Sequence, residues 1–338
     1  MEETHLKIKK LLSLFLCAVM IFSFCGCEAI YNTILDRMYE KEPLPSTSSD
    51  SEDEMLEPLD PNWPVSVFGT ELDEAPKKVA VASPALAEYL SDMDLLNNVC
   101  AVSDYCGFGS ASSYKSIGSV RLPDMEAIKA VAPEYILTFS QYEESILIEL
   151  QQMNITVIVI DAPKNLDELR SLFKNCALFF LGAVDGVTYG EAFVSLYNEE
   201  LSSLAYTGEK KTAAFIRALD YTMFTGGTME NELLSLAGFI NAAEEYSDYT
   251  FPADNWKDFD PDVLFINPNL HLIDLETNDL YKKKSAVLGD KVFNADLDVI
   301  ALCSFRSLAI IKDMLATVYS DYTGGTPLSP AYPSMYSK

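Results

Sequence analysis

Histidine is nearly absent from this chain of 338 residues, which contains only His5 and His271. Two histidines cannot build a zinc site that depends on imidazole, and they leave little room for acid–base catalysis by this side chain. Basic residues are also few: 24 Lys and Arg stand against 51 Asp and Glu, which gives a formal net charge of −27. Because so acidic a surface repels phosphate backbones, the composition argues against nucleic-acid binding.

Recognisable catalytic motifs are missing as well. The sequence contains neither a Gly-x-Ser-x-Gly nucleophile motif nor a Walker phosphate loop. Its nearest approach to a phosphate loop, Thr225-Gly226-Gly227-Thr228, lacks the basic residue and the spacing. No set of His, Asp and Glu at metal-ligand spacing is visible. These absences predict that the protein is not an enzyme and that it has no metal site or cofactor of its own.

The first 27 residues have the order of an export signal. Lysines stand at positions 7, 9 and 10, and residues 11–24 are mostly apolar, a run shorter than the roughly 20 residues of a membrane span. The run closes with Phe24-Cys25-Gly26-Cys27, which resembles a bacterial lipobox, although Leu is usual where Phe24 stands. We expect residues 1–27 to be a lipoprotein signal and lipidated Cys27 to anchor the protein to the outer face of the cytoplasmic membrane. An ordinary secretory signal or a short membrane anchor is the alternative.

Two segments outside the folded part have a polar, low-complexity composition. Residues 28–75 contain a run of Ser, Pro, Asp and Glu that cannot bury enough apolar surface to order itself, which predicts a disordered acidic tether. Residues 321–338 are rich in Gly, Pro, Ser and Tyr and are expected to form a flexible tail.

Four cysteines remain beyond the signal: Cys100, Cys106, Cys176 and Cys303. An even number permits disulfides in an exported protein. Because their spacing matches no metal or redox motif, we expect buried free thiols instead.

Between the tether and the tail, short apolar runs alternate with helical patterns. Such runs occur at residues 79–81, 99–102, 135–137 and 156–160, and again at 212–216, 239–240, 263–266 and 299–302. This alternation predicts an α/β protein of two Rossmann-like lobes, residues 76–165 and 208–320, each with a mostly parallel sheet. Residues 166–207 are mostly helical, with an interruption near Gly182 to Gly186. Their second part, about 30 Å long, predicts a single long backbone helix that joins the lobes.

A small repeat occurs at matched places in the two lobes. Glu126 stands seven positions before Pro133, and Asp254 stands seven before Pro261; each proline precedes a buried strand. In the first copy the apolar stripe of the short helix leaves Glu126 facing solvent, and in the second Trp256 and Phe259 leave Asp254 exposed.

Several short motifs follow one another across residues 77–318: Ser83-Pro84, Ser103-Asp104-Tyr105, Ile117-Gly118, Met125-Glu126, Pro133-Glu134, Gly226-Gly227-Thr228, Leu236-Ala237-Gly238 with Asn241, Asp260-Pro261-Asp262, Ala286-Val287 and Lys291-Val292-Phe293. In this order the chain resembles the class III, helical-backbone periplasmic binding proteins, the solute-binding lipoproteins of ABC importers for cobalamin, ferric siderophores and haem. The resemblance implies a monomer that captures a metal chelate between two lobes and delivers it to a permease and its ATPase. It also implies one exposed carboxylate per lobe that docks on permease arginines, by position Glu126 and Asp254. Because Glu is usual in the second lobe, the shorter Asp254 departs from the pattern.

Ligands of parallel sheets bind outside the carboxyl ends of the strands. The loops expected there are rich in aromatic rings and poor in charge, which suits a large, flat or apolar ligand. The candidate ligand-binding residues are Tyr105, Phe108, Tyr114, Lys115, Tyr142, Phe224, His271 and Arg306.

The residues leave the identity of the chelate open. A ferric siderophore is often anionic, and only Lys115 and Arg306 offer positive charge; a corrinoid needs only apolar walls, so the two rank equally. Haem ranks third, with Tyr105 or His271 as an axial ligand. A surface adhesin or sensory lipoprotein that reuses the same fold is the alternative function.

Overall fold

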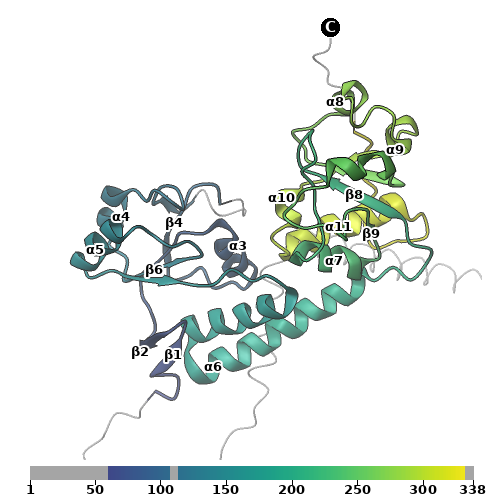
Figure 1. The fold of residues 1–338 in the computed structure, drawn as a ribbon. Coiled ribbons are helices and arrows are strands. Elements are labelled where there is room, and N and C mark those ends of the chain that lie inside the picture. Colours follow the sequence, from purple (N-terminus) through teal and green to yellow (C-terminus); the bar gives the residue numbers. More distant parts are fainter. Residues whose placement is uncertain (1–59, 107–112, 332–338) are drawn as a thin grey trace, which may run out of the picture. The chain divides into compact units, whose positions relative to one another are not determined.

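The computed structural model describes residues 60–106 and 113–331 (Figure 1). The expectations for Cys27 and Phe108 fall outside these residues. The chain divides into two compact units. The N-terminal unit holds the described residues up to Ile160 together with Phe173–Phe193, and the C-terminal unit holds Asp161–Leu172 together with the described residues from Val194 onward.

The N-terminal unit is built on a parallel sheet of five strands in the order β5-β4-β3-β6-β7. Its central strands β3 and β6 are buried, as the continuous apolar runs predict. The elements are β3 (Val79–Val81), α3 (Pro84–Asp92), β4 (Val99–Val102), β5 (Lys115–Ser116), α4 (Met125–Val131), β6 (Tyr135–Thr138), α5 (Glu144–Gln152) and β7 (Thr156–Val159).

The C-terminal unit repeats this plan with four parallel strands in the order β11-β10-β8-β9. Its elements are β8 (Thr212–Ile216), α7 (Met229–Ala237), β9 (Ile240–Asn241), η2 (Ala253–Asp258), β10 (Val263–Ile266), α8 (Leu272–Thr277), α9 (Ser285–Leu288), β11 (Val292–Asn294), α10 (Leu297–Ile300) and α11 (Phe305–Val318). The predicted α/β class with parallel sheets is therefore confirmed.

The strand order places a topological switch point in each sheet. In the N-terminal unit the chain runs outward from β3 to β5 and then returns to β6 on the other side of β3. In the C-terminal unit β9 lies on one side of β8, and β10 and β11 lie on the other. Crevices outside the strand ends at such points are where parallel sheets bind ligands. In this protein these points lie between β3 and β6 and between β8 and β10.

The prediction of a strand at residues 299–302 is wrong. The segment begins with α10, whose N-cap Asp296 accepts a hydrogen bond from the Val299 N–H at 3.1 Å. The fourth strand of this unit lies upstream, at Val292–Asn294. Asp296, three residues before Val299, is a helix-start signal, and it outweighs the β-propensity of Val299 and Ile300.

Part of the expected tether is folded. β1 (Val65–Val67) and β2 (Thr70–Leu72) form an antiparallel hairpin whose burial alternates residue by residue in β1, with Val65 and Val67 buried. The ring of Phe68 contacts that of Phe179, with centroids 6.3 Å apart. The disordered region expected up to residue 75 therefore does not include the hairpin, because Val65, Val67 and Phe68 pack against the folded unit.

The tail also differs from the expectation over residues 321–331. Ala331 is buried, and its N–H donates to the Val292 carbonyl at 2.8 Å. The Thr326 N–H donates to Asp313 at 2.7 Å. These bonds attach the segment to the C-terminal unit.

The connecting segment is α6 (Leu166–Leu204), and its predicted interruption is confirmed at Gly182, whose φ of 82° is non-helical. The two halves of α6 run antiparallel (Figure 1). A Cβ at Gly186 would lie 2.7 Å from the Ala177 carbonyl oxygen, and one at Gly190 would lie 2.9 Å from the Lys174 Cα. Glycines spaced four residues apart thus let the two helices approach closely.

Candidate functional site

The switch point of the C-terminal unit carries a positive charge. Strands β8 and β10 pair in register up to Ile216 and Ile266, so Arg217 and Asn267 follow them as neighbours at the carboxyl edge. The Asn267 N–H donates to the Ile216 carbonyl at 3.2 Å, which holds the two strand ends together. Arg217 therefore occupies the position where an α/β sheet receives its ligand.

Two aromatic rings and one carboxylate hold the Arg217 guanidinium. Its Cζ lies 6.0 Å from the Phe224 ring centroid and 5.8 Å from that of Tyr249, within cation–π range. Its Nη2 donates to Asp298 at 2.6 Å, and Asp298 also accepts from the Asn267 amide at 3.5 Å. The side chain of Arg217 is one-third exposed. Its remaining N–H groups donate to none of the described residues, so they are available to a ligand.

A buried carboxylate lies beside this group. Glu230, on the first turn of α7, is only 3% exposed, and its Oε1 has no hydrogen-bond partner among the described residues. Its carboxylate interacts electrostatically with the Tyr249 phenol. Burial, and then the charge of Glu230, raise the pKa of Tyr249 to about 12, so the phenol remains a hydrogen-bond donor at neutral pH.

This arrangement offers a held guanidinium at the carboxyl edge of the sheet. A guanidinium with a fixed plane matches the geometry of a carboxylate, which it can hold by two parallel N–H···O bonds. The ion pair with Asp298 keeps Arg217 in position but contributes little energy, because Asp298 is about two-thirds exposed.

The predicted ligand residues of the C-terminal unit have different surroundings. Phe224 is fully buried and forms the ring under Arg217. His271 is exposed and stands before α8, where its N–H donates to Asp274 at 2.8 Å. Arg306 is half-buried in the first turn of α11. Of these three residues, Phe224 is the one with a described contact to the Arg217 guanidinium.

The predicted ligand-binding residues of the N-terminal unit also differ in their surroundings. Tyr105 is 90% exposed, with a left-handed φ of 66° just after β4. Lys115 is exposed in β5, and Tyr114 beside it is half-buried. Burial raises the pKa of Tyr114, and Asp94 adds to that effect.

Tyr142 belongs to the core, with 4% of its surface exposed. Burial raises its pKa to about 12. Its hydroxyl has no hydrogen-bond partner among the described residues, and the nearby Thr138 hydroxyl donates to the carbonyls of Ala82 and Ser140.

The two matched acidic residues both lie at the start of a short helix. Glu126 is the second residue of α4, which Asp124 caps by accepting from the Ala127 N–H at 3.0 Å. Asp254 is the second residue of η2, a 3₁₀ helix. Both side chains are exposed.

Sequence reasoning missed Arg217, Tyr249, Glu230 and Asp298. The signal for Arg217 was present, since a basic residue directly follows the buried run 212–216. Tyr249 and Asp298 come from segments with no strand pattern, and only the fold brings them beside β8.

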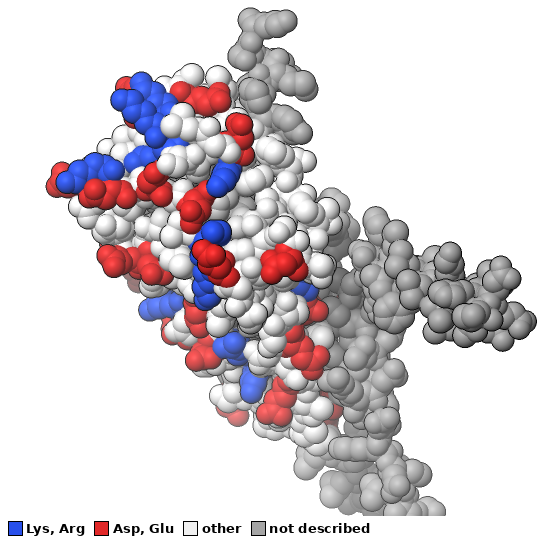
Figure 2. Space-filling model, turned by 90° about the vertical axis from the view of Figure 1, so that its right-hand side faces the viewer, with Lys and Arg blue, Asp and Glu red and all other residues white. Residues whose placement is uncertain are grey.

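Acidic side chains are spread over the face of the molecule that Figure 2 shows, with basic ones interspersed among them. Among the residues that the structure describes, no group of three or more His, Cys, Asp or Glu is placed to hold a metal ion. The four described cysteines are free.

Comparison with known proteins identifies the family. The model of the family described as periplasmic binding protein matches residues 79–298. The chain belongs to this family. Its members are the extracytoplasmic substrate-binding proteins of ABC importers, and the predicted fold and function are both confirmed at this level.

Three relatives illustrate the similarity. The Fe(3+)-citrate-binding protein YfmC of Bacillus subtilis is 24% identical over 221 residues, which cover 63% of this chain and 70% of the relative. A solved structure described as a possible iron-binding, periplasmic solute-binding protein of Staphylococcus epidermidis has a TM-score of 0.60 at 15% identity and covers 73% of this chain and 100% of the other. The vitamin B12-binding protein BtuF of Vibrio cholerae has a TM-score of 0.55 at 17% identity and covers 71% and 96%. The two structures share the fold.

Proposed function

We propose that this binding protein captures an anionic ferric chelate, of the kind in which carboxylates surround the iron, and delivers it to an ABC permease. The observation that carries the proposal is Arg217 at the switch point of the C-terminal unit, with N–H groups left for a ligand. The Fe(3+)-citrate binding of the Bacillus subtilis relative supports the same ligand class.

The other two chelates fit this group less well. A corrinoid needs apolar walls and no charge, whereas the switch point presents the Arg217 guanidinium, which is paired with Asp298. The axial ligands expected for haem were Tyr105 and His271, and His271 is not among the described contacts of Arg217. The ranking from sequence, in which siderophore and corrinoid were equal, therefore shifts to the anionic ferric chelate.

A binding panel tests this assignment. The protein without residues 1–27 is mixed with ferric citrate, a ferric hydroxamate siderophore, cyanocobalamin or haemin, and passed over a gel-filtration column. We expect the visible band of ferric citrate to co-elute with the protein, at micromolar Kd or better, about −8 kcal/mol. Co-elution of cyanocobalamin or haemin alone would contradict the proposal.

We also propose that Glu126 and Asp254 dock the protein onto its permease. Both are exposed at the start of a short helix in separate units, and exposed charges mainly tune association with a partner. The double variant Glu126→Ala/Asp254→Ala should keep its Kd for ligand and lose uptake in reconstituted vesicles. The matched control Glu149→Ala/Glu276→Ala removes one exposed acidic residue from each unit and should leave uptake unchanged. Loss of ligand affinity in the first variant would show that these residues line the ligand site instead.

Membrane attachment is the third part of the proposal. Lipidated Cys27 would tether the protein to the outer face of the cytoplasmic membrane. The support is the sequence of the first 27 positions, in which basic residues are followed by an apolar run and then by Gly-Cys. The Cys27→Ala variant should leave the membrane fraction and lack the acyl mass. Unchanged retention without acyl mass would show that the apolar segment itself is the anchor.

A further inference from the structure

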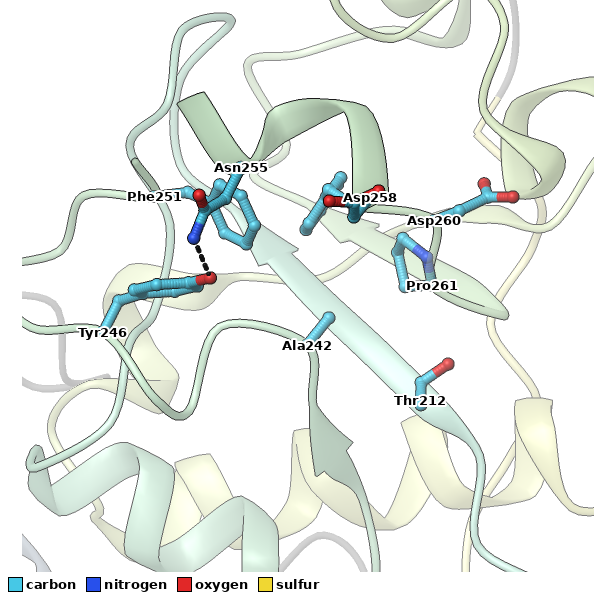
Figure 3. A pocket seen from close by; sticks show the side chains of 9 residues that line it. Thr212, Ala242, Tyr246, Phe251, Asn255, Asp258, Asp260 and Pro261 are labelled. Carbon is cyan, nitrogen blue, oxygen red and sulfur yellow. Dashed lines mark hydrogen bonds between the residues drawn. The ribbon is translucent and has the colours of Figure 1, made fainter. Parts of the chain in front are cut away.

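The C-terminal unit contains a second candidate site at the opposite ends of its strands. A pocket of about 400 Å³ opens beside Thr212, the first residue of β8, whereas Arg217 follows the last residue of the same strand (Figure 3). Two of the residues that line the pocket, Thr212 and Ala242, have small side chains and so leave its volume open. Nothing in the proposed capture of a chelate uses this pocket.

Its walls combine aromatic rings with negative charge. Tyr246, Phe251 and Phe259 contribute three rings, and the Tyr246 and Phe251 rings meet with centroids 4.7 Å apart. Asp258 contributes a carboxylate, and the lining contains no Lys or Arg; Asp260 also lines the pocket, but its two oxygens accept from the N–H and the hydroxyl of Ser285 at 2.7 and 2.6 Å. Aromatic faces and carboxylates attract the same partner, a cation.

The acceptor groups of the pocket are incompletely used. Asp258 has one weak ion pair, to Lys257 at 4.0 Å, with both side chains nearly four-fifths exposed. The Asn255 amide nitrogen donates to the Tyr246 hydroxyl at 2.8 Å, as the dashed line in Figure 3 shows. This bond directs the Asn255 nitrogen toward the ring and leaves its amide oxygen as a second acceptor.

The wall that bears Asp258 is fixed from behind. Lys284 is buried, and its Nζ donates to the Trp256 carbonyl at 2.7 Å and to the Phe259 carbonyl. Its ammonium also lies 4.9 Å from the Trp256 ring centroid. Because both carbonyls that flank Asp258 are held, the carboxylate is presented without the cost of ordering the segment.

We propose that this pocket binds an aliphatic cation, an ammonium or guanidinium group on a short carbon chain. The charged end is placed against Asp258 and the Asn255 oxygen, and the carbon chain against the rings. The net charge of −27 raises the local concentration of such cations around the protein. The cation is either a free amine or the basic side chain of a partner protein, and both have the same chemistry at the site.

Trp256 provides the readout. The chain has two tryptophans, so Trp63→Phe leaves Trp256, which stacks on Phe259 at 4.4 Å, as the single reporter. Titration of this variant with agmatine should give a saturable change in emission, and neutral butylurea should give none. Asp258→Asn should weaken agmatine binding at least fivefold, whereas the control Asp290→Asn, an exposed carboxylate outside the pocket, should not change it.

A capped Gly-Arg-Gly peptide separates the two sources of the cation. Binding at least tenfold tighter than agmatine would assign the pocket to a partner's side chain, and weaker binding would assign it to a free amine. Calorimetry on the unmodified chain repeats the agmatine titration without a substitution. No saturable binding in either assay, or equal binding by the Asp258→Asn and Asp290→Asn variants, would overturn the proposal. No chelate is used, so the outcome is independent of the proposed ligand at Arg217.

Discussion

Asn62 caps a helix that begins more than a hundred residues later in the chain. Its side-chain oxygen accepts from the backbone N–H of Asp185 at 2.9 Å and from that of Val184 at 3.1 Å, and its amide donates to the Asp185 carboxylate at 3.0 Å. The second half of α6 starts after Gly182 with unsatisfied N–H groups, and Asn62 satisfies two of them. A Cβ at Gly182 would lie 2.5 Å from the Asn62 Cβ, so a glycine is required there.

We therefore expect Asn62→Ala to destabilise the N-terminal unit by about 1 kcal/mol, the usual contribution of a helix N-cap. Urea unfolding followed by circular dichroism measures the change. Asn62→Asp keeps an acceptor for the two N–H groups but faces the Asp185 carboxylate. Its stability should therefore lie between that of the unmodified chain and that of Asn62→Ala. Equal stability of Asn62→Ala and the unmodified chain would show that the cap contributes nothing.

The close packing within α6 gives a second prediction. Gly190→Ala places a Cβ 2.9 Å from the Lys174 Cα, a backbone atom that cannot move alone. We expect a net loss of about 1–2 kcal/mol, because the strain exceeds the roughly 1 kcal/mol gained from the better helix propensity of alanine. Ser195→Ala, on the exposed side of the same helix, is the control and should be neutral or slightly stabilising. A Gly190→Ala variant that unfolds later than the unmodified chain would contradict the close approach.

Acid stability depends on Asp262, which holds Thr212 at the start of β8. Asp262 accepts from the Thr212 N–H at 2.9 Å and from its hydroxyl at 2.8 Å, and these hydrogen bonds lower the pKa of Asp262. A carboxyl whose pKa is lower in the folded state binds fewer protons there than in the unfolded chain. Its stabilisation is therefore fully present above the unfolded pKa of about 3.9 and is lost as the pH falls below it.

Asp262→Asn should accordingly cost about 1 kcal/mol at pH 7, a modest figure because the carboxylate is exposed and screened. The difference between the variant and the unmodified chain should shrink below about pH 4. Denaturant unfolding at a series of pH values measures it. A stability difference between the variant and the unmodified chain that grew on acidification would contradict a lowered pKa of Asp262 in the folded state.

Much of the fold could be predicted from the sequence, because buried parallel strands are continuous apolar runs. The run at 212–216 became β8 and the run at 263–266 became β10. Residues 299–302 failed because a local helix cap overrode a β-branched run. The hairpin at 65–72 was missed because its two strands of three residues are too short to show a period of two against a polar background.

The candidate site was harder to predict. Aromatic residues in loops cannot be assigned to a ligand or to the core by type alone: Tyr142 became core, and Phe224 became the support of a charged group. Arg217 could have been found by asking which residue follows each strand at the switch point. That question needs the strand order, which pairing of distant segments determines and which the local pattern does not contain.

The Kd of ferric citrate for the Arg217→Gln variant shows whether this guanidinium holds the ligand. Titration followed by tyrosine and tryptophan emission should show a loss of about 1.5–3 kcal/mol, roughly 10- to 150-fold, because a charge-assisted hydrogen bond is removed. Arg217→Lys, which keeps the charge but not the planar pair of donors, should lose less. The control Lys210→Gln removes an exposed positive charge from the same unit and should bind as the unmodified chain does. If Arg217→Gln, folded as judged by thermal unfolding, binds ferric citrate with unchanged Kd, the anion site at the β8–β10 switch point is not where this protein holds its ligand.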